Sequence, residues 1–182
     1  MQITPLALDG AALVALEPRH DDRGFFARSF CRAEFTAAGL EPAVEQVNVS
    51  CNTAAGTLRG LHWQTEPAPE AKLVRCTRGA VADVVVDVRP GSPTYLQHVV
   101  VELTAANRLA VYVPPLCAHG YLTLEPDTEV TYQVSAPYTP GAERGLRYDD
   151  PALGIVWPGP VRHVSDKDLS WEALDAPGAA TT

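Results

Sequence analysis

The chain has 182 residues, a length that predicts one domain with a single hydrophobic core. Apolar residues make up 46% and charged residues 20%, which excludes a wholly disordered, collagen-like or coiled-coil chain. The formal net charge of −8 argues against a nucleic-acid partner, so any anionic ligand has to be met by a local cluster of basic side chains.

No segment of the sequence is typical of a membrane span or a secretory signal. The longest stretch without Asp, Glu, Lys or Arg, residues 109–124, contains two prolines and is too short to cross a bilayer. The first residues lack a basic region ahead of their apolar run, so a cytoplasmic location is expected. Four scattered cysteines with no C-x-x-C pair indicate reduced thiols, with no zinc site and no disulfide frame.

A short peripheral helix is predicted over residues 31–38. Phe30, Ala33 and Phe35 would face the core, and Gly39 would end the helix in a left-handed conformation. Eight strands follow, each a short apolar or alternating run bounded by Gly, Pro or polar residues. They are residues 44–50, 57–64, 71–78, 80–89, 98–103, 108–113, 119–124 and 129–135.

The strand at residues 80–89 has the clearest alternation. One face is apolar and the other includes Asp83 and Asp87, so we expect the second face to line a wet space. No long helical pattern alternates with the strands, which favours an all-β jelly-roll or cupin-like barrel with a few short helices. Residues 1–170 would form this domain, and residues 171–182 a flexible tail.

A histidine and an arginine share the strand at residues 57–64. Strict alternation would send Arg59 and His62 to opposite faces, but Gly60 between them could host a β-bulge that re-aims one side chain. Lys72, in the next strand, could then lie over the same pocket. An incidental polar strand is an equally good interpretation of these residue types.

Three further residues are candidates on weaker grounds. His119 and Tyr132 lie in later strands, where a lone buried His or Tyr is more often a satisfied core residue. Asp168 follows Lys167 near the C-terminus, where it is either part of a solvated turn or the buried partner of a histidine.

Order and spacing carry more information than any one of these segments. The segments are Asp22-Arg23-Gly24-Phe25-Phe26, Gln46-Val47-Asn48-Val49-Ser50, residues 56–64, Lys72-Leu73-Val74, residues 83–93, Ala118-His119-Gly120, Tyr132, Tyr138-x-Pro140, Asp149-Asp150-Pro151 and Ser165-x-Lys167-Asp168. From about residue 17 to residue 170 the chain thereby resembles the dTDP-4-dehydrorhamnose 3,5-epimerase family. The resemblance implies a cupin-like jelly roll without metal or organic cofactor, and a homodimer that exchanges N-terminal strands.

The resemblance also implies a reaction, the conversion of dTDP-4-dehydro-6-deoxyglucose to dTDP-4-dehydrorhamnose by inversion at C3 and C5. His62 would be the base, oriented by Asp168, and Tyr132 the acid on the opposite face of the sugar. Lys72 and His119 would stabilise the keto oxygen and bind the sugar. The remaining matches assign substrate binding to Arg23, Phe26, Arg28, Gln46, Asn48, Arg59, Tyr138, Glu143 and Lys167, with Tyr138 stacked on the base.

The chain departs from the family pattern at four places. Arg28 stands where Glu is usual in a segment that contacts the nucleoside, which bears on the choice of base. Leu116-Cys117 replaces a Gly-Phe pair, so the turn before His119 would change its backbone. Gln133 replaces a Lys beside Tyr132, and Trp63 replaces a Tyr after His62. None of these changes removes an acid or a base.

Three alternatives stay open. An epimerase for one centre, or for another nucleotide in a deoxysugar pathway, is motivated by Arg28 and Leu116. A metal-dependent cupin would commonly need an H-x-H pair, and His62 is followed by Trp63 and Gln64. A non-catalytic sugar-nucleotide binder would have no need to keep the base, its Asp and the acid together.

Overall fold

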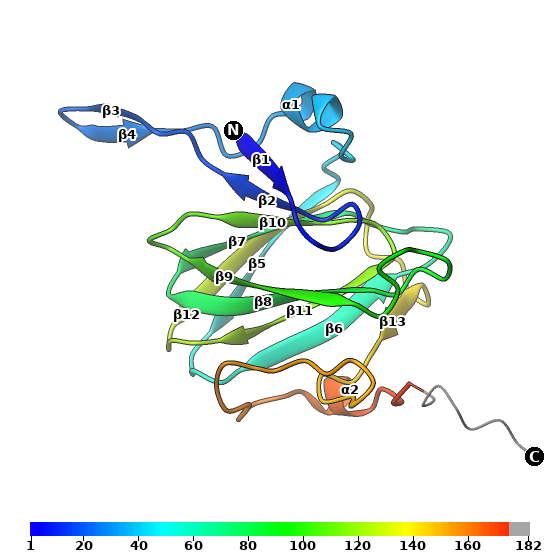
Figure 1. Cartoon of the computed structure of the whole chain (residues 1–182). Coiled ribbons are helices and arrows are strands. Elements are labelled where there is room, and N and C mark those ends of the chain that lie inside the picture. Colours follow the sequence, from blue (N-terminus) through cyan, green and yellow to red (C-terminus); the bar gives the residue numbers. More distant parts are fainter. Residues whose placement is uncertain (175–182) are drawn as a thin grey trace, which may run out of the picture.

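Two antiparallel sheets face each other in the computed structural model, which describes residues 1–174 (Figure 1). The six-stranded sheet consists, in spatial order, of β1 (Gln2–Pro5), β2 (Ala12–Ala15), β10 (Ala110–Val113), β7 (Lys72–Arg78), β12 (Thr128–Val134) and β5 (Gln46–Asn52). The five-stranded sheet consists of β13 (Glu143–Gly145), β6 (Leu58–Gln64), β11 (Cys117–Thr123), β8 (Ala80–Asp87) and β9 (His98–Thr104). The predicted all-β, cupin-like fold is confirmed.

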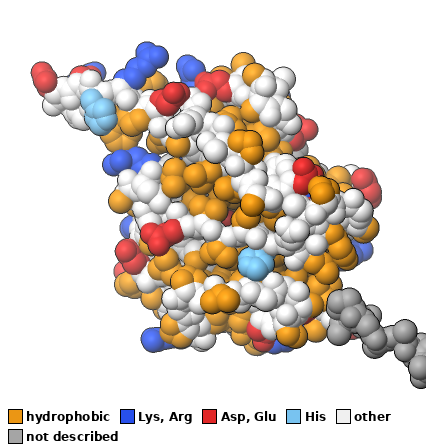
Figure 2. Space-filling model, viewed as in Figure 1, with side chains coloured by type: hydrophobic (Ala, Val, Ile, Leu, Met, Phe, Trp, Pro, Cys, Tyr) orange, Lys and Arg blue, Asp and Glu red, His pale blue; other side chains and the backbone are white. Residues whose placement is uncertain are grey.

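A separate hairpin of β3 (Arg19–Asp21) and β4 (Gly24–Phe26) stands away from the two sheets (Figure 1). Figure 2 shows it as a projection that carries charged side chains. All six residues of its strands are exposed, and the side chain of Phe26 has 71% of its surface open to solvent. The Arg108 guanidinium lies over the Phe25 ring, 4.7 Å from its centroid, but the exposure of all six residues means that little packing holds the hairpin in place.

The eight predicted strands all exist, with ends shifted by one or two residues. The prediction missed β1, β2, β3, β4 and β13, which have only three or four residues each. So few residues show at most two periods of alternation, and pairing with a neighbouring strand is what makes them strands.

The apolar core fills most of the space between the sheets. Its largest cluster takes alternate residues from both sheets, among them Val74, Val81, Val85, Val111 and Val130, each without exposed surface. Period-two alternation directs these side chains inward. The segment after β13 covers the outer face of the five-stranded sheet.

Burial of both faces overturns the expectation of a wet face on β8. All eight residues of β8 are buried, because the sheet is covered on both sides. On the inner face, Oδ2 of Asp83 is hydrogen-bonded to His119 while its Oδ1 has no partner within residues 1–174, and Asp87 accepts from Arg89, Ser92 and Thr94. The two buried carboxylates therefore form hydrogen bonds with side chains of the protein and do not face solvent.

The helix and the tail each need one correction. In α1 (Arg32–Ala37), Phe35 is buried and Gly39 has the expected left-handed φ of +73°, but Ala33 faces solvent because it lies about 200° round the helix from Phe35. Residues 171–174 belong to the domain, since the Leu174 amide donates to Asp150 and its side chain joins the outer cluster. Residues 175–182 of the expected tail lie outside the described residues.

The turn before β11 has a left-handed backbone at Leu116. Leu116 adopts a φ of +58°, a conformation that costs a residue with a side chain about 1–2 kcal/mol. The following Cys117 is buried, which raises the pKa of its thiol to about 12. All four cysteines are free. No helix within residues 1–174 is long and apolar enough to cross a membrane.

Candidate active site

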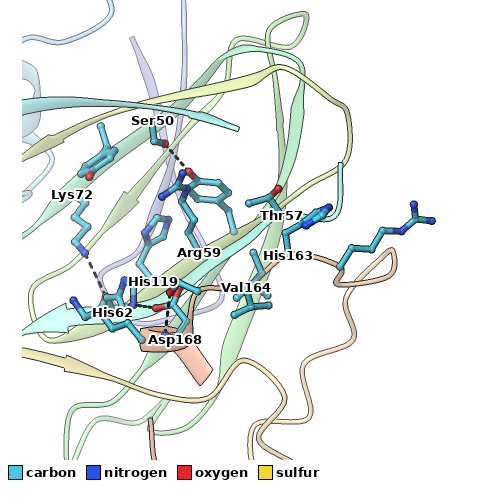
Figure 3. A pocket seen from close by; sticks show the side chains of 15 residues that line it. Ser50, Thr57, Arg59, His62, Lys72, His119, His163, Val164 and Asp168 are labelled. Carbon is cyan, nitrogen blue, oxygen red and sulfur yellow. Dashed lines mark hydrogen bonds and ion pairs between the residues drawn. The ribbon is translucent and has the colours of Figure 1, made fainter. Parts of the chain in front are cut away.

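A cavity of about 620 Å³ opens between the two sheets at one end of the core (Figure 3). The five-stranded sheet contributes Arg59, His62 and His119 to its wall. The six-stranded sheet contributes Lys72 and Tyr132 from the other side. The segment at residues 162–168 closes one edge of the cavity.

A β-bulge brings Arg59 and His62 to the same wall, as predicted. His62 pairs with His119 and Arg59 pairs with Tyr121, so β6 has one more residue than β11 between these two pairs. Gly60, in the bulge, has a φ of +125°, a conformation that glycine adopts without a steric penalty. The bulge resets the alternation, and both side chains line the cavity.

Asp168 holds the imidazole of His62. Its Oδ1 lies 2.5 Å from His62 Nε2, and its side chain is 5% exposed. Burial alone would raise the pKa of Asp168. The hydrogen bond and the charge of His62 have the opposite effect, as do hydrogen bonds from Gly60 and Ser165, and the pKa of Asp168 is lowered below its ordinary value. An ionised carboxylate only accepts hydrogen bonds, so Nε2 carries the hydrogen and Nδ1 is left as the basic nitrogen.

The lowered pKa of Asp168 predicts an acid-dependent loss of stability. Above its ordinary value of 3.8, Asp168 is ionised in both states and its stabilisation is fully present. As the pH falls below that value, the unfolded chain binds a proton first, so the contribution disappears as the pH passes through the lowered pKa. Urea unfolding of the wild type and Asp168→Asn should give a stability difference that shrinks as the pH falls from 5 toward 2. A difference that did not change with pH would contradict the assignment.

The opposite wall presents a phenol and an ammonium group. Burial, followed by the nearby Tyr121 and Glu70, raises the pKa of Tyr132, so its hydroxyl keeps its proton at neutral pH. Lys72 Nζ lies 3.1 Å from Glu70 Oε1 and donates to the carbonyl of His62 at 3.3 Å. The ammonium is thus held close to the strand that carries the candidate base.

A second, smaller cavity of about 150 Å³ adjoins the first. The two share His62, Lys72 and Tyr132 in their walls. The far wall of the second cavity includes Gln46, Asn48, Tyr138 and Glu143. Tyr138 is 59% exposed there, and its backbone N–H donates to Gln46 Oε1. Glu143 bonds Lys167 at 2.5 Å across the boundary between the cavities.

All but three of the predicted site residues line these two cavities. Those that do are Gln46, Asn48, Arg59, His62, Lys72, His119, Tyr132, Tyr138, Glu143, Lys167 and Asp168. Arg23 and Phe26 lie instead on the projecting hairpin and Arg28 just beyond it; Arg23 pairs with Asp21, and Arg28 with Glu34. Within one chain, the structure does not bring these three to the cavities.

The prediction missed several residues of the cavity. Ser50 and Tyr121 line it, and Asp83 bonds His119 beneath it at 2.9 Å. Alternation already put Ser50 on the face of Gln46 and Asn48. The same alternation, continued two residues beyond the predicted strand end, puts Asn52 on that face. Glu70, which lines the second cavity and pairs with Lys72, gave no such signal.

Trp171 packs behind the candidate base. Its ring and that of His62 meet edge to face, with centroids 6.2 Å apart. Gly145, paired with His62 across β13 and β6, makes room for the indole, because a Cβ there would lie 2.1 Å from Trp171 Cε2. A residue assigned to a tail from the sequence therefore forms part of the wall around the base.

Gly145→Ala is expected to displace Trp171 and destabilise the protein by about 1–3 kcal/mol, the usual scale of overpacking. Gly159→Ala is the matched control, since a Cβ there would have no atom within 4 Å and should change stability by less than about 0.5 kcal/mol. Urea unfolding measures both. Adding Trp171→Ala to Gly145→Ala should recover part of the loss; a further loss would show that the indole is not the obstacle.

The larger cavity concentrates positive charge in an acidic protein. Besides Arg59, Lys72 and Lys167, its wall includes Arg162 and the imidazoles of three histidines. This is the local basic cluster that an anionic ligand requires. Within residues 1–174, no group of three or more His, Cys, Asp or Glu side chains is arranged to hold a metal ion.

Comparisons with known proteins agree on one family. The family model described as dTDP-4-dehydrorhamnose 3,5-epimerase matches residues 5–176. A curated dTDP-4-dehydrorhamnose 3,5-epimerase of Sinorhizobium fredii is 45% identical over 171 residues, covering 92% of this chain and 88% of its own length.

Solved structures give the same result. A dTDP-4-dehydrorhamnose 3,5-epimerase from Bacillus anthracis with TDP and PPi bound has a TM-score of 0.91 and 36% identity, covering 95% of this chain and 99% of that one. An epimerase from Legionella pneumophila in complex with dTDP-4-keto-L-rhamnose has a TM-score of 0.88 and 34% identity, covering 94% of this chain and 92% of that one.

Proposed function

The chain belongs to the dTDP-4-dehydrorhamnose 3,5-epimerase family and is a carbohydrate epimerase; from that premise we propose that His62 and Tyr132 carry its two proton transfers. The observation that carries the proposal is their position on facing walls of one cavity. Inversion at carbon requires a base on one face of the sugar and an acid on the other. Two facing sheets supply that geometry.

In the first step, Nδ1 of His62 takes the proton from the carbon next to the ketone. The electron pair of the C–H bond forms an enolate with the C4 carbonyl, and negative charge develops on its oxygen. Lys72 and His119 stabilise that oxygen, and an ammonium group in a partly buried site does so more strongly than in water. Asp168 stabilises the imidazolium formed at His62.

In the second step, the Tyr132 hydroxyl gives its proton to the same carbon from the opposite face. The enolate collapses to the ketone with the centre inverted, and solvent returns the phenol and the imidazole to their starting states. The raised pKa of Tyr132 supports this role, because the donor is then protonated before each turnover. The same cycle at the second carbon gives the 3,5-epimer.

The nucleotide would occupy the second cavity and the boundary between the two. Arg59 and Lys167 are the cations available for the diphosphate, and Tyr138 is an exposed ring available for stacking on the base. Gln46, Asn48 and Glu143 supply polar groups around it. We propose a dTDP-linked sugar as the substrate, by analogy with the ligands of the solved relatives.

The test is proton exchange in heavy water. The protein is incubated with dTDP-4-dehydro-6-deoxyglucose, and deuterium at C3 and C5 is followed by NMR. Uptake at both carbons, with formation of the rhamnose isomer, is the expected result. Uptake at C3 alone would identify a single-centre epimerase, and no uptake would point to another nucleotide sugar or to a binding protein.

Tyr132→Phe should separate exchange from inversion. His62 would still remove the proton and return deuterium from its own side, while inversion falls by about 10²–10⁴, the usual contribution of a positioned acid. The NMR coupling constants of the sugar report the inversion independently of exchange. Equal loss of exchange and inversion would place Tyr132 in proton removal instead.

We further propose that the protein is a homodimer in which the hairpin of one copy reaches the cavity of the other. The hairpin projects from its own chain, and Phe25 and Phe26 are 42% and 71% exposed on it although the Arg108 guanidinium lies over the Phe25 ring. Exposed aromatic side chains beside Arg23 are typical of a segment that packs against a partner. Arg28 would then approach the nucleoside, where it bears on the choice of base.

Mixed dimers test this arrangement. The His62→Ala and Arg23→Ala variants are expected to be impaired separately and to recover activity when combined, because exchange assembles one intact site per mixed dimer. A monomeric mass in light scattering, or no recovery on mixing, would contradict the exchange. A cytoplasmic location is also proposed, supported by four free thiols, and fractionation of cells that produce the protein would test it.

A further inference from the structure

Asn52, at the end of β5, is buried and makes three side-chain hydrogen bonds. It is 3% exposed. Its Oδ1 accepts from Arg59 Nε at 2.7 Å, and its Nδ2 donates to the Thr128 carbonyl at 3.2 Å. A longer contact of 3.4 Å joins Nδ2 to the Tyr121 hydroxyl. These contacts link four strands, β5, β6, β11 and β12, around one edge of the cavity.

The direction of the amide follows from its partners. A carbonyl oxygen only accepts, so the amide nitrogen of Asn52 must face Thr128 and its oxygen must face Arg59. Within residues 1–174, this is the single hydrogen bond made by the Arg59 guanidinium. Because it takes up the inner Nε, both terminal nitrogens are left for a ligand in the cavity.

The same network leaves one hydroxyl hydrogen available to a ligand. Ser50 and Tyr121 both line the cavity, and their hydroxyls lie 2.6 Å apart, so one hydrogen bond joins them. That bond uses one of the two hydroxyl hydrogens. Asn52 Nδ2 is a donor and cannot accept the other, and no second acceptor lies near either hydroxyl in the described part of the chain.

We propose that Asn52 is a positioning residue for Arg59, and that the Ser50–Tyr121 hydroxyl pair donates one hydrogen bond to the substrate. The substrate would present an anionic group to Arg59 and an acceptor oxygen to the pair, either a phosphate oxygen or a sugar oxygen next to the diphosphate. This inference rests on the proposed function for the identity of the anion. Beyond the proposed function, the inference identifies a residue, Asn52, that fixes the direction of the Arg59 guanidinium.

The first test measures the Kd of dTDP by calorimetry. Asn52→Ala should weaken binding about tenfold, the scale of one charge-assisted hydrogen bond. In Arg59→Ala, adding Asn52→Ala should change nothing more, because the residue on which Asn52 acts is gone. Cys51→Ala is the matched control, since this neighbour on β5 is exposed and lines neither cavity. In turnover, KM of the Asn52 variant should rise about tenfold with kcat changed less than about twofold.

Equal effects of Asn52→Ala in the wild-type and Arg59→Ala backgrounds would overturn the positioning role. A wild type that binds dTDP while Asn52→Ala keeps the same Kd would overturn this inference alone. A wild type that does not bind dTDP would overturn the nucleotide assignment and this inference with it.

The second test removes both hydroxyls in Ser50→Ala/Tyr121→Phe. A weaker Kd for dTDP would identify a phosphate oxygen as the acceptor. An unchanged Kd for dTDP with a raised KM for the keto sugar would identify a sugar oxygen. No change in either constant would overturn the assignment of the hydroxyl pair.

Discussion

His62→Ala should abolish deuterium uptake at C3 and C5, with a fall in the exchange rate of about 10³ or more. The expected size follows from the contribution of a positioned base, about 10²–10⁴, together with loss of the group that Asp168 orients. NMR in heavy water measures the rate. dTDP affinity should stay close to that of the wild type, because the proposed diphosphate contacts lie at Arg59 and Lys167.

Asp168→Asn is the matched variant for this prediction. It keeps the volume of the side chain but exchanges an ionised acceptor for a neutral amide, so the imidazolium at His62 loses its charge partner. Exchange should fall less than in His62→Ala and should be lost in the same proportion at both carbons. Substantial exchange in His62→Ala would remove His62 from the role of base and direct attention to another group in the cavity.

Gly60→Ala should be the most damaging of the small substitutions. A Cβ at Gly60 would lie 2.5 Å from Gly120 Cα and 2.8 Å from the His119 carbonyl oxygen, and both are backbone atoms that cannot turn aside. Because of this clash and the φ of +125°, we expect the free energy of unfolding, measured in urea, to fall by about 3–5 kcal/mol. Any folded fraction should also lose activity, because the bulge sets the direction of His62.

Gly24→Ala separates the clash from the backbone conformation. Gly24 has nearly the same φ, +126°, but a Cβ there would have no atom within 4 Å. The free energy of unfolding of Gly24→Ala should therefore fall by only about 1–2 kcal/mol, the cost of the backbone strain. Equal losses at the two positions would mean that the close approach of β6 and β11 is not what requires a glycine at Gly60.

Both predictions concern the β-bulge in β6. The bulge in β6 places the proposed base His62 and the candidate phosphate ligand Arg59 on the same wall, and the opposite sheet carries the proposed acid Tyr132. A change that restored strict alternation would send either Arg59 or His62 out of the cavity. Stability and activity therefore depend on the same glycine.

Much of the site was readable in the sequence. Short alternating runs gave the strands of both sheets, because side-chain direction in a strand depends only on local spacing. Gly60 indicated a possible bulge, again from the local sequence, since glycine tolerates the backbone conformation of a bulge. The choice between a solvated turn and a buried partner for Asp168 was open until its contact with His62 was seen.

Other features depended on the tertiary structure. Burial of Asp83 and Asp87 reflects the packing of the inner face of β8 against strands of the other sheet, which local alternation cannot indicate. Trp171 reaches His62 only because Gly145 leaves space for it. The sequence by itself determined the eight predicted strands, the position at which a bulge was possible and the chemical types of the candidate catalytic groups, since each depends on residues close in the chain. The tertiary structure decided which groups meet, because hydrogen bonds such as Asn52 to Arg59 join separate strands whose approach depends on the packing of the whole domain.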